Sequence, residues 1–63
     1  MITPMIGSLV MEYDGALGMI HHKKESYYYV EWLIGGSGIF YYHPAEIEEM
    51  LNRYKKYRME NGL

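Results

Sequence analysis

The chain has 63 residues, a formal net charge of −2 and no cysteine. A chain of this length is one domain that buries only about 60% of the surface exposed by its unfolded form, and the missing cysteine excludes disulfides and thiolate zinc sites as supports. The negative charge argues against generic binding of nucleic acid, which depends on lysine and arginine at phosphates.

The N-terminal part predicts two strands joined by a tight turn. Residues 7–13 alternate between apolar and mixed positions, as in a half-buried strand. Asp14-Gly15 favours a hairpin turn because glycine tolerates a positive φ. Residues 17–23 form the second strand, in which Gly18 indicates a bulge or a close backbone approach. The apolar positions of the first strand are Leu9, Met11 and Tyr13.

The central part predicts a second hairpin. Residues 27–33 have the highest β-propensity in the chain, and residues 39–42 form the returning strand after a glycine-rich turn. A period of two separates the residues of the first of these strands into two faces. Because Glu31 belongs to one of the faces, we assign the other to the core. The core face carries Tyr28, Val30 and Trp32.

The C-terminal part predicts a helix over residues 44–58. Pro44 suits a first helical turn, where its missing N–H costs no internal hydrogen bond. Acidic residues lie in the first turns and basic residues in the last, which matches the helix macrodipole. Asn61-Gly62 is a suitable C-terminal stop. The apolar stripe of this helix includes Ile47, Met50, Leu51, Tyr54 and either Tyr57 or Arg58.

Together these elements predict a mainly β fold in a single domain, residues 1–63. We expect a small SH3-like antiparallel barrel of four or five strands over residues 7–42, with a C-terminal amphipathic α-helix over residues 44–58 packed on it. The expected core residues are Leu9, Leu17, Ile20, Tyr28, Val30, Trp32, Ile47 and Leu51.

A run of these residues resembles a known group of proteins. The matching residues are Gly7, Leu9, Val10, Leu17, Gly18, Ile20, Tyr28, Val30, Trp32 and Glu46-Ile47. Their order is similar to that in the small SH3-like barrel proteins encoded by tailed bacteriophages, including phages of cyanobacteria, whose functions are mostly unassigned. The resemblance covers about residues 7 to 47 and implies the fold and a phage origin. This chain departs from the pattern in the helix that continues after Glu46-Ile47.

Catalytic and metal sites are not expected. No serine, threonine or lysine lies in a recognisable nucleophile motif, so we expect no enzyme and no cofactor. His21 and His22 point to opposite faces of a regular strand, and they cannot share an ion without a bulge. His43 comes from a distant strand end. We therefore interpret these histidines as surface residues and expect no metal.

The aromatic surplus favours a protein-interaction module. The chain has eight tyrosines, and a barrel of this size cannot enclose all of them. Tyrosine is enriched at protein interfaces, and an exposed apolar patch indicates a partner or a second copy of the chain. The expected contact residues are Tyr27, Tyr29, Leu33 and Tyr57. The resemblance to phage proteins implies that the partner is a phage or host protein and that the protein is found in the virion or the host cytoplasm. We also expect that a homo-oligomer can form and that no membrane is involved.

The alternative function is binding of nucleic acid. Lys23 and Lys24 come shortly before Tyr27 and Tyr29, and basic groups beside aromatic rings are typical of platforms that stack single strands. This alternative predicts binding that falls steeply with salt.

Overall fold

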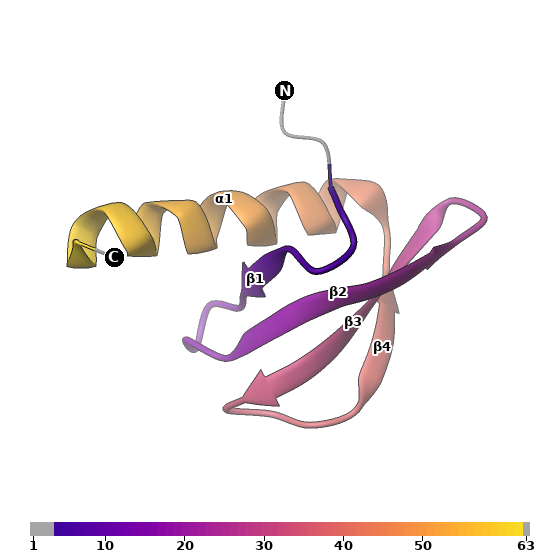
Figure 1. The fold of residues 1–63 in the computed structure, drawn as a ribbon, viewed down its shortest axis with the longest axis horizontal. Coiled ribbons are helices and arrows are strands. Elements are labelled where there is room, and N and C mark those ends of the chain that lie inside the picture. The colour runs from indigo at the N-terminus through magenta and orange to yellow at the C-terminus, as the bar shows by residue number, and fades with distance from the viewer. Residues whose placement is uncertain (1–3, 63) are drawn as a thin grey trace.

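The computed structural model describes residues 4–62 and shows four strands followed by one helix (Figure 1). The elements are β1 (Leu9–Met11), β2 (Leu17–Lys24), β3 (Tyr27–Ile34), β4 (Ile39–Tyr42) and α1 (Pro44–Asn61). The predicted order and type of the elements are confirmed. The first strand is shorter than expected, and the helix continues past residue 58.

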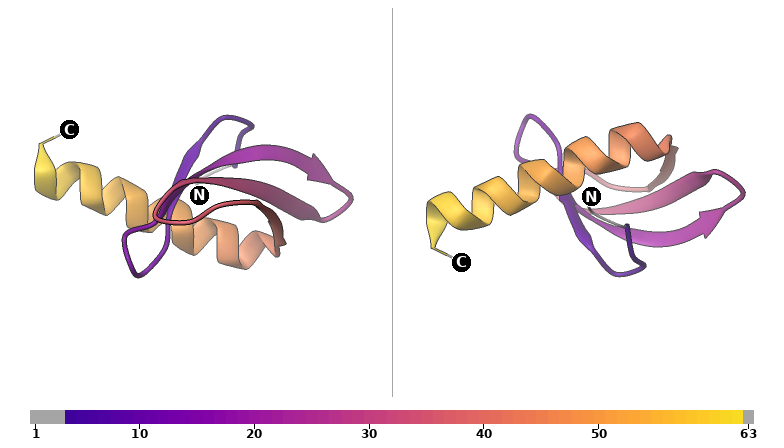
Figure 2. Two further views of the ribbon diagram at one scale, coloured as in Figure 1. Left: turned by 90° about the horizontal axis from the view of Figure 1, so that it is seen from below. Right: turned by 90° about the horizontal axis from the view of Figure 1, so that it is seen from above.

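The strands form one antiparallel sheet in the order β1-β2-β3-β4. Over residues 4–62, β1 and β4 do not pair with each other, so hydrogen bonds do not close the sheet into the expected barrel. The cause is local: β1 has only three residues, and α1, which follows β4, packs mainly against β1. Figure 2 shows α1 crossing one face of this open sheet.

Two register shifts interrupt the pairing of β2 with β3, one between Leu17 and Gly18 and one between Ile20 and His22. A Cβ atom on Gly18 would lie 2.7 Å from Cγ1 of Val30 and 2.8 Å from Cε3 of Trp32. Only glycine lets the two strands approach this closely. The prediction of a bulge or a close approach at Gly18 is confirmed, and the structure shows both.

The core lies between the sheet and α1. Most of the expected core residues are buried, whereas Leu9 and Leu17 are only half-buried, so their assignment was wrong. Val10 pairs with Gly18, which in turn pairs with Trp32, and this register turns Val10 toward the core and Leu9 away from it. The buried residues of the core cluster are Val10, Ala16, Ile20, Tyr28, Val30, Trp32, Ile47, Met50 and Leu51.

Both ends of α1 are capped. The His43 side chain accepts a hydrogen bond from the backbone N–H of Ala45 at 3.2 Å, and Glu46 Oε1 accepts one from the backbone N–H of His43 at 2.9 Å. This reciprocal pair is a capping box. At the other end, Gly62 adopts φ 69° and closes the helix, which confirms the predicted stop.

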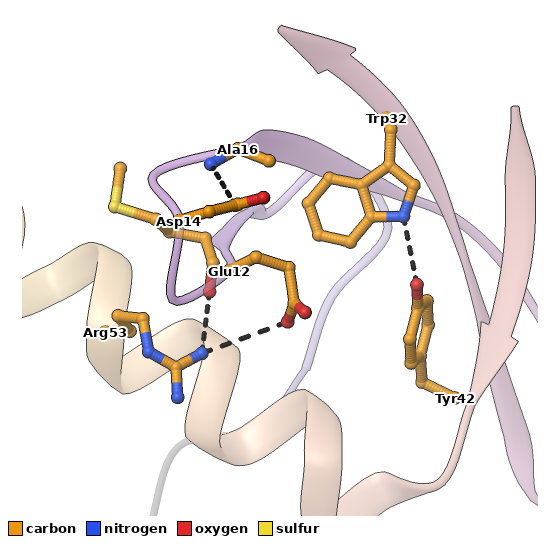
Figure 3. A network of polar contacts seen from close by, with 7 residues as sticks. Glu12, Asp14, Ala16, Trp32, Tyr42 and Arg53 are labelled. Carbon is orange, nitrogen blue, oxygen red and sulfur yellow. Dashed lines mark hydrogen bonds and ion pairs between the residues drawn. The ribbon is translucent and has the colours of Figure 1, made fainter. Parts of the chain in front are cut away.

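Polar contacts fix the turn between β1 and β2 against α1 (Figure 3). Asp14 Oδ1 accepts a hydrogen bond from the backbone N–H of Ala16 at 2.9 Å, which stabilises the predicted turn. Arg53 Nη1 donates to the Met11 carbonyl oxygen at 2.9 Å and lies 4.0 Å from Glu12 Oε1. Arg53 therefore ties the helix to the end of the short edge strand.

Candidate interaction surface

The sheet register brings aromatic residues from three strands to the face that points away from α1. His22 on β2 pairs with Tyr29 on β3, which pairs in turn with Tyr41 on β4. Cross-strand partners share a face of a sheet, so the three side chains lie side by side. Tyr27 joins them two residues before Tyr29. We call His22, Tyr27, Tyr29 and Tyr41 the aromatic face.

The rings of the aromatic face contact one another. The His22 ring stacks on the Tyr29 ring with centroids 4.3 Å apart and planes 9° apart. Tyr41 lies between the other two tyrosines, with its centroid 5.4 Å from that of Tyr27 and 6.0 Å from that of Tyr29. Ring pairs at such separations attract one another beyond simple area burial. The cluster is thus held in one arrangement while much of it stays open to solvent.

The four predicted contact residues do not form one surface. Tyr27 and Tyr29 both contact Tyr41, but Leu33 lies toward the opposite end of β3, where it is exposed beside Ile34. The C-terminal half of α1 extends away from the β2–β3 turn (Figures 1 and 2). Tyr57 belongs to this half, and its ring stacks on that of Tyr54. The aromatic face therefore includes two of the four residues.

The two lysines of the nucleic-acid alternative are divided between the faces of the sheet. Lys24 pairs with Tyr27, whereas Lys23 pairs with the buried Tyr28 and places its Nζ 5.4 Å from that ring's centroid. Only Lys24 lies beside the aromatic face. A platform that needs both lysines next to Tyr27 and Tyr29 does not form on this sheet.

The adjacent histidines lie at the second register shift. The bulge leaves His21 without a paired residue on β3 and brings its Nδ1 to 2.7 Å from Nδ1 of His22, so the regular alternation expected for the pair does not hold. One ring donates and the other accepts. Over residues 4–62, no three histidine, aspartate or glutamate side chains are placed to hold a metal ion together.

Sequence reasoning did not single out His22 or choose between Tyr41 and Tyr42. The alternation of β4 against β3 separates these tyrosines: Tyr41 is 64% exposed, while Tyr42 is half-buried and accepts a hydrogen bond from Trp32. Pairing the predicted strands in register is the signal that would have selected Tyr41. The place of His22 depends on the bulge, for which the sequence carries no signal at that position.

Comparison with known proteins gives no match, whether with family models, with curated proteins or with solved structures. Over residues 4–62, the structure contains no helix with the length and apolar character needed to cross a membrane.

Proposed function

We propose that this chain is a non-enzymatic protein-interaction module of a tailed phage, which binds a phage or host protein through the aromatic face. The observation that carries the proposal is the mutual packing of Tyr27, Tyr29 and Tyr41 on an exposed sheet face. In this role the protein is either a component of the virion or its assembly, or a factor that acts on a host protein.

Pre-packed tyrosines suit this role for two physical reasons. Each ring contributes a large apolar area and a hydroxyl that can still form hydrogen bonds at the edge of a contact. Binding also costs conformational entropy for each side chain that it immobilises, and rings that already pack on one another lose less. A partner therefore meets a surface whose shape exists before binding.

The proposal includes the class of fold to which the sheet and helix belong. We take the sheet as an open variant of the SH3-like barrels that the sequence resembles. The two register shifts, at which a bulge would bend the sheet, support this assignment, as does the packing of α1 against β1 and β3. Fold alone does not specify a function, so the functional part depends on the aromatic face.

Nucleic-acid binding is the second candidate, and the pairing of Lys24 with Tyr27 is the observation that favours it. A single lysine beside stacked rings supplies little of the phosphate contact on which such binding depends, and the net charge of −2 opposes it. This candidate predicts that binding weakens steeply as salt is raised.

The experiment is capture of partners by the tagged protein from lysate of phage-infected cells, with and without nuclease, followed by mass spectrometry. We expect to recover one protein in stoichiometric amount, and its recovery should not change when nuclease is added. The Tyr13→Ser variant should still capture this protein, whereas the double variant Tyr27→Ser/Tyr29→Ser should not. Tyr13 is a matched control because it is 84% exposed and lies outside the aromatic face. Recovery that disappears with nuclease supports the nucleic-acid candidate instead.

Purified particles supply the remaining part of the test. If the chain is a virion component, mass spectrometry of washed particles detects it at a fixed ratio to the capsid protein. If it acts on a host protein, it is found only in the infected cytoplasm.

A further inference from the structure

The outer edge of β4 carries unpaired peptide groups. Trp32 donates its backbone N–H to the Gly38 carbonyl oxygen, and the pairs that follow are Val30 with Phe40 and Tyr28 with Tyr42. In an antiparallel ladder, alternate residues direct both backbone groups to the same neighbour. The N–H and C=O groups of the intervening residues, Ile39 and Tyr41, therefore point away from β3. Over residues 4–62, no other strand pairs with this edge.

Apart from its short length of four residues, this edge lacks the features that usually prevent strand addition. Natural edge strands are protected by a charged side chain, a proline, a bulge or a covering helix. β4 has the sequence Ile-Phe-Tyr-Tyr, its pairing with β3 is regular, and α1 packs on β1 and β3 instead. Its side chains are open to solvent: Ile39 is 46% exposed, Phe40 55% and Tyr41 64%.

From these observations we propose that two copies of this chain pair through β4, antiparallel across a two-fold axis, into one continuous sheet. The axis passes between Phe40 and Phe40 of the partner subunit. Ile39 then lies opposite Tyr41 of the partner subunit, and these two residues exchange their outward N–H···O=C hydrogen bonds. This register uses every outward backbone group of Ile39 and Tyr41, and it places apolar side chains against apolar side chains on both faces.

A second copy fits this edge better than a strand of unrelated chemistry. The edge is uncharged, so a partner strand needs apolar side chains and outward backbone groups at the same spacing, and β4 itself has both. A two-fold axis also makes the contact closed, because each edge is used once and no filament forms.

The exposed area of β4 limits the size of the contact. Tyr and Phe side chains present about 150–250 Å² each, so Phe40 and Tyr41 each offer roughly 100 Å². With Ile39 and the backbone included, the total over both copies is roughly 700 Å², which is in the range of weak and transient contacts. We therefore expect a weak, reversible dimer whose population rises with chain concentration.

Cysteine substitution tests the register directly, because the chain has no cysteine of its own. Non-hydrogen-bonded antiparallel partners have Cα atoms about 4.5 Å apart, within the range for a disulfide. Phe40→Cys should therefore form a disulfide-linked dimer under mild oxidation at 100 µM. Ser26→Cys, exposed at the β2–β3 turn, should stay monomeric. Monomeric Phe40→Cys, or equal crosslinking of both variants, overturns the proposal.

Introducing a charge at position 40, next to the two-fold axis, gives a second test that does not depend on oxidation. Phe40→Lys and Phe40→Glu should each sediment as monomers, because like charges meet at the two-fold axis, and an equimolar mixture should regain the dimer. Circular dichroism confirms that each variant is folded, and sedimentation of the unmodified chain must show mass rising with concentration. A constant monomer mass up to several hundred micromolar, or a mixture that stays monomeric, contradicts the dimer.

The dimer contact and the aromatic face share Tyr41, but different variants test them. Phe40 is on the face of β4 opposite to Tyr41, so the Phe40 variants leave the rings of the aromatic face in place. If the unmodified chain stays monomeric but captures a partner, only the edge pairing is overturned. If it dimerises but captures no partner, only the partner-binding role of Tyr27 and Tyr29 is overturned.

Discussion

The indole Nε1 of Trp32 donates a hydrogen bond to the Tyr42 hydroxyl at 3.0 Å, and the two rings meet edge to face with their centroids 6.2 Å apart (Figure 3). Trp32 is the largest side chain of the core cluster, and Tyr42 is the residue through which β4 packs against it. This contact holds the last strand in place and so positions both Tyr41 and the open edge.

Removing the Tyr42 hydroxyl should cost less than removing the indole. Tyr42→Phe leaves the Trp32 N–H without its acceptor at a partly buried site that water can reach, and we expect a loss of about 1 kcal/mol in the free energy of unfolding. Trp32→Ala also opens a cavity and should cost about 3–5 kcal/mol, enough to unfold so small a domain. Urea unfolding followed by circular dichroism measures both. Equal losses would show that the indole contributes only through its hydrogen bond.

A methyl group at position 18 should disrupt the sheet. Gly18→Ala places a Cβ atom within 3.0 Å of Glu31 O and closer still to Val30 and Trp32, so β2 and β3 must move apart. Overpacking of this kind typically costs about 1–3 kcal/mol. Gly36→Ala is the matched control, because its Cβ would meet only the Trp32 side chain at an ordinary 3.6 Å. Similar thermal midpoints for the two variants would contradict the close approach.

The anchor of α1 on β1 should depend on the contacts of Arg53 with Met11 and Tyr13 more than on its ion pair with Glu12. Arg53 donates to the Met11 carbonyl oxygen, and its guanidinium lies 3.9 Å from the Tyr13 ring centroid. We expect Arg53→Met to lower the free energy of unfolding by about 1 kcal/mol. Glu12→Gln removes only a long, partly exposed ion pair and should cost less than about 0.5 kcal/mol. A larger effect of Glu12→Gln in urea unfolding would reverse this ranking.

The start of α1 offers a stabilising change. His43 is the N-cap, although serine, threonine, aspartate and asparagine cap helices better. His43→Asp keeps the capping geometry and adds a negative charge at the positive end of the helix macrodipole, which should raise the free energy of unfolding by about 0.5 kcal/mol. Glu46→Ala removes the reciprocal hydrogen bond and should lower it by a similar amount. Thermal unfolding of the two variants should shift in opposite directions.

The sequence predicted the elements that carry strong local signals. Glu31 marked the outer face of β3, and Pro44 with Asn61-Gly62 marked the ends of the helix. For β1, the alternation over residues 7–13 placed Leu9 on the core face. All three residues of β1 are apolar, and the pairing of Val10 with Gly18 decides its orientation. The open sheet likewise depends on where α1 packs, which is a tertiary property.

The candidate site was predictable to a similar degree. Period two placed Tyr27 and Tyr29 on the outer face correctly. Assigning Tyr41 to the aromatic face requires the register between β3 and β4. Assigning His22 to it requires the bulge at His21. Lys23 and Lys24 are adjacent in the sequence, but the alternation of the strand places them on opposite faces of the sheet. This separation weakens the case for nucleic-acid binding.

The most direct test of the partner-binding role is photo-crosslinking from the aromatic face. Benzoylphenylalanine replaces Tyr27 in one variant and Tyr13 in the other, and both are irradiated in nuclease-treated lysate of infected cells. We predict that position 27 crosslinks to a single protein and that position 13 does not. Equal yields from the two positions, or crosslinks from position 27 to nucleic acid alone, would contradict the account.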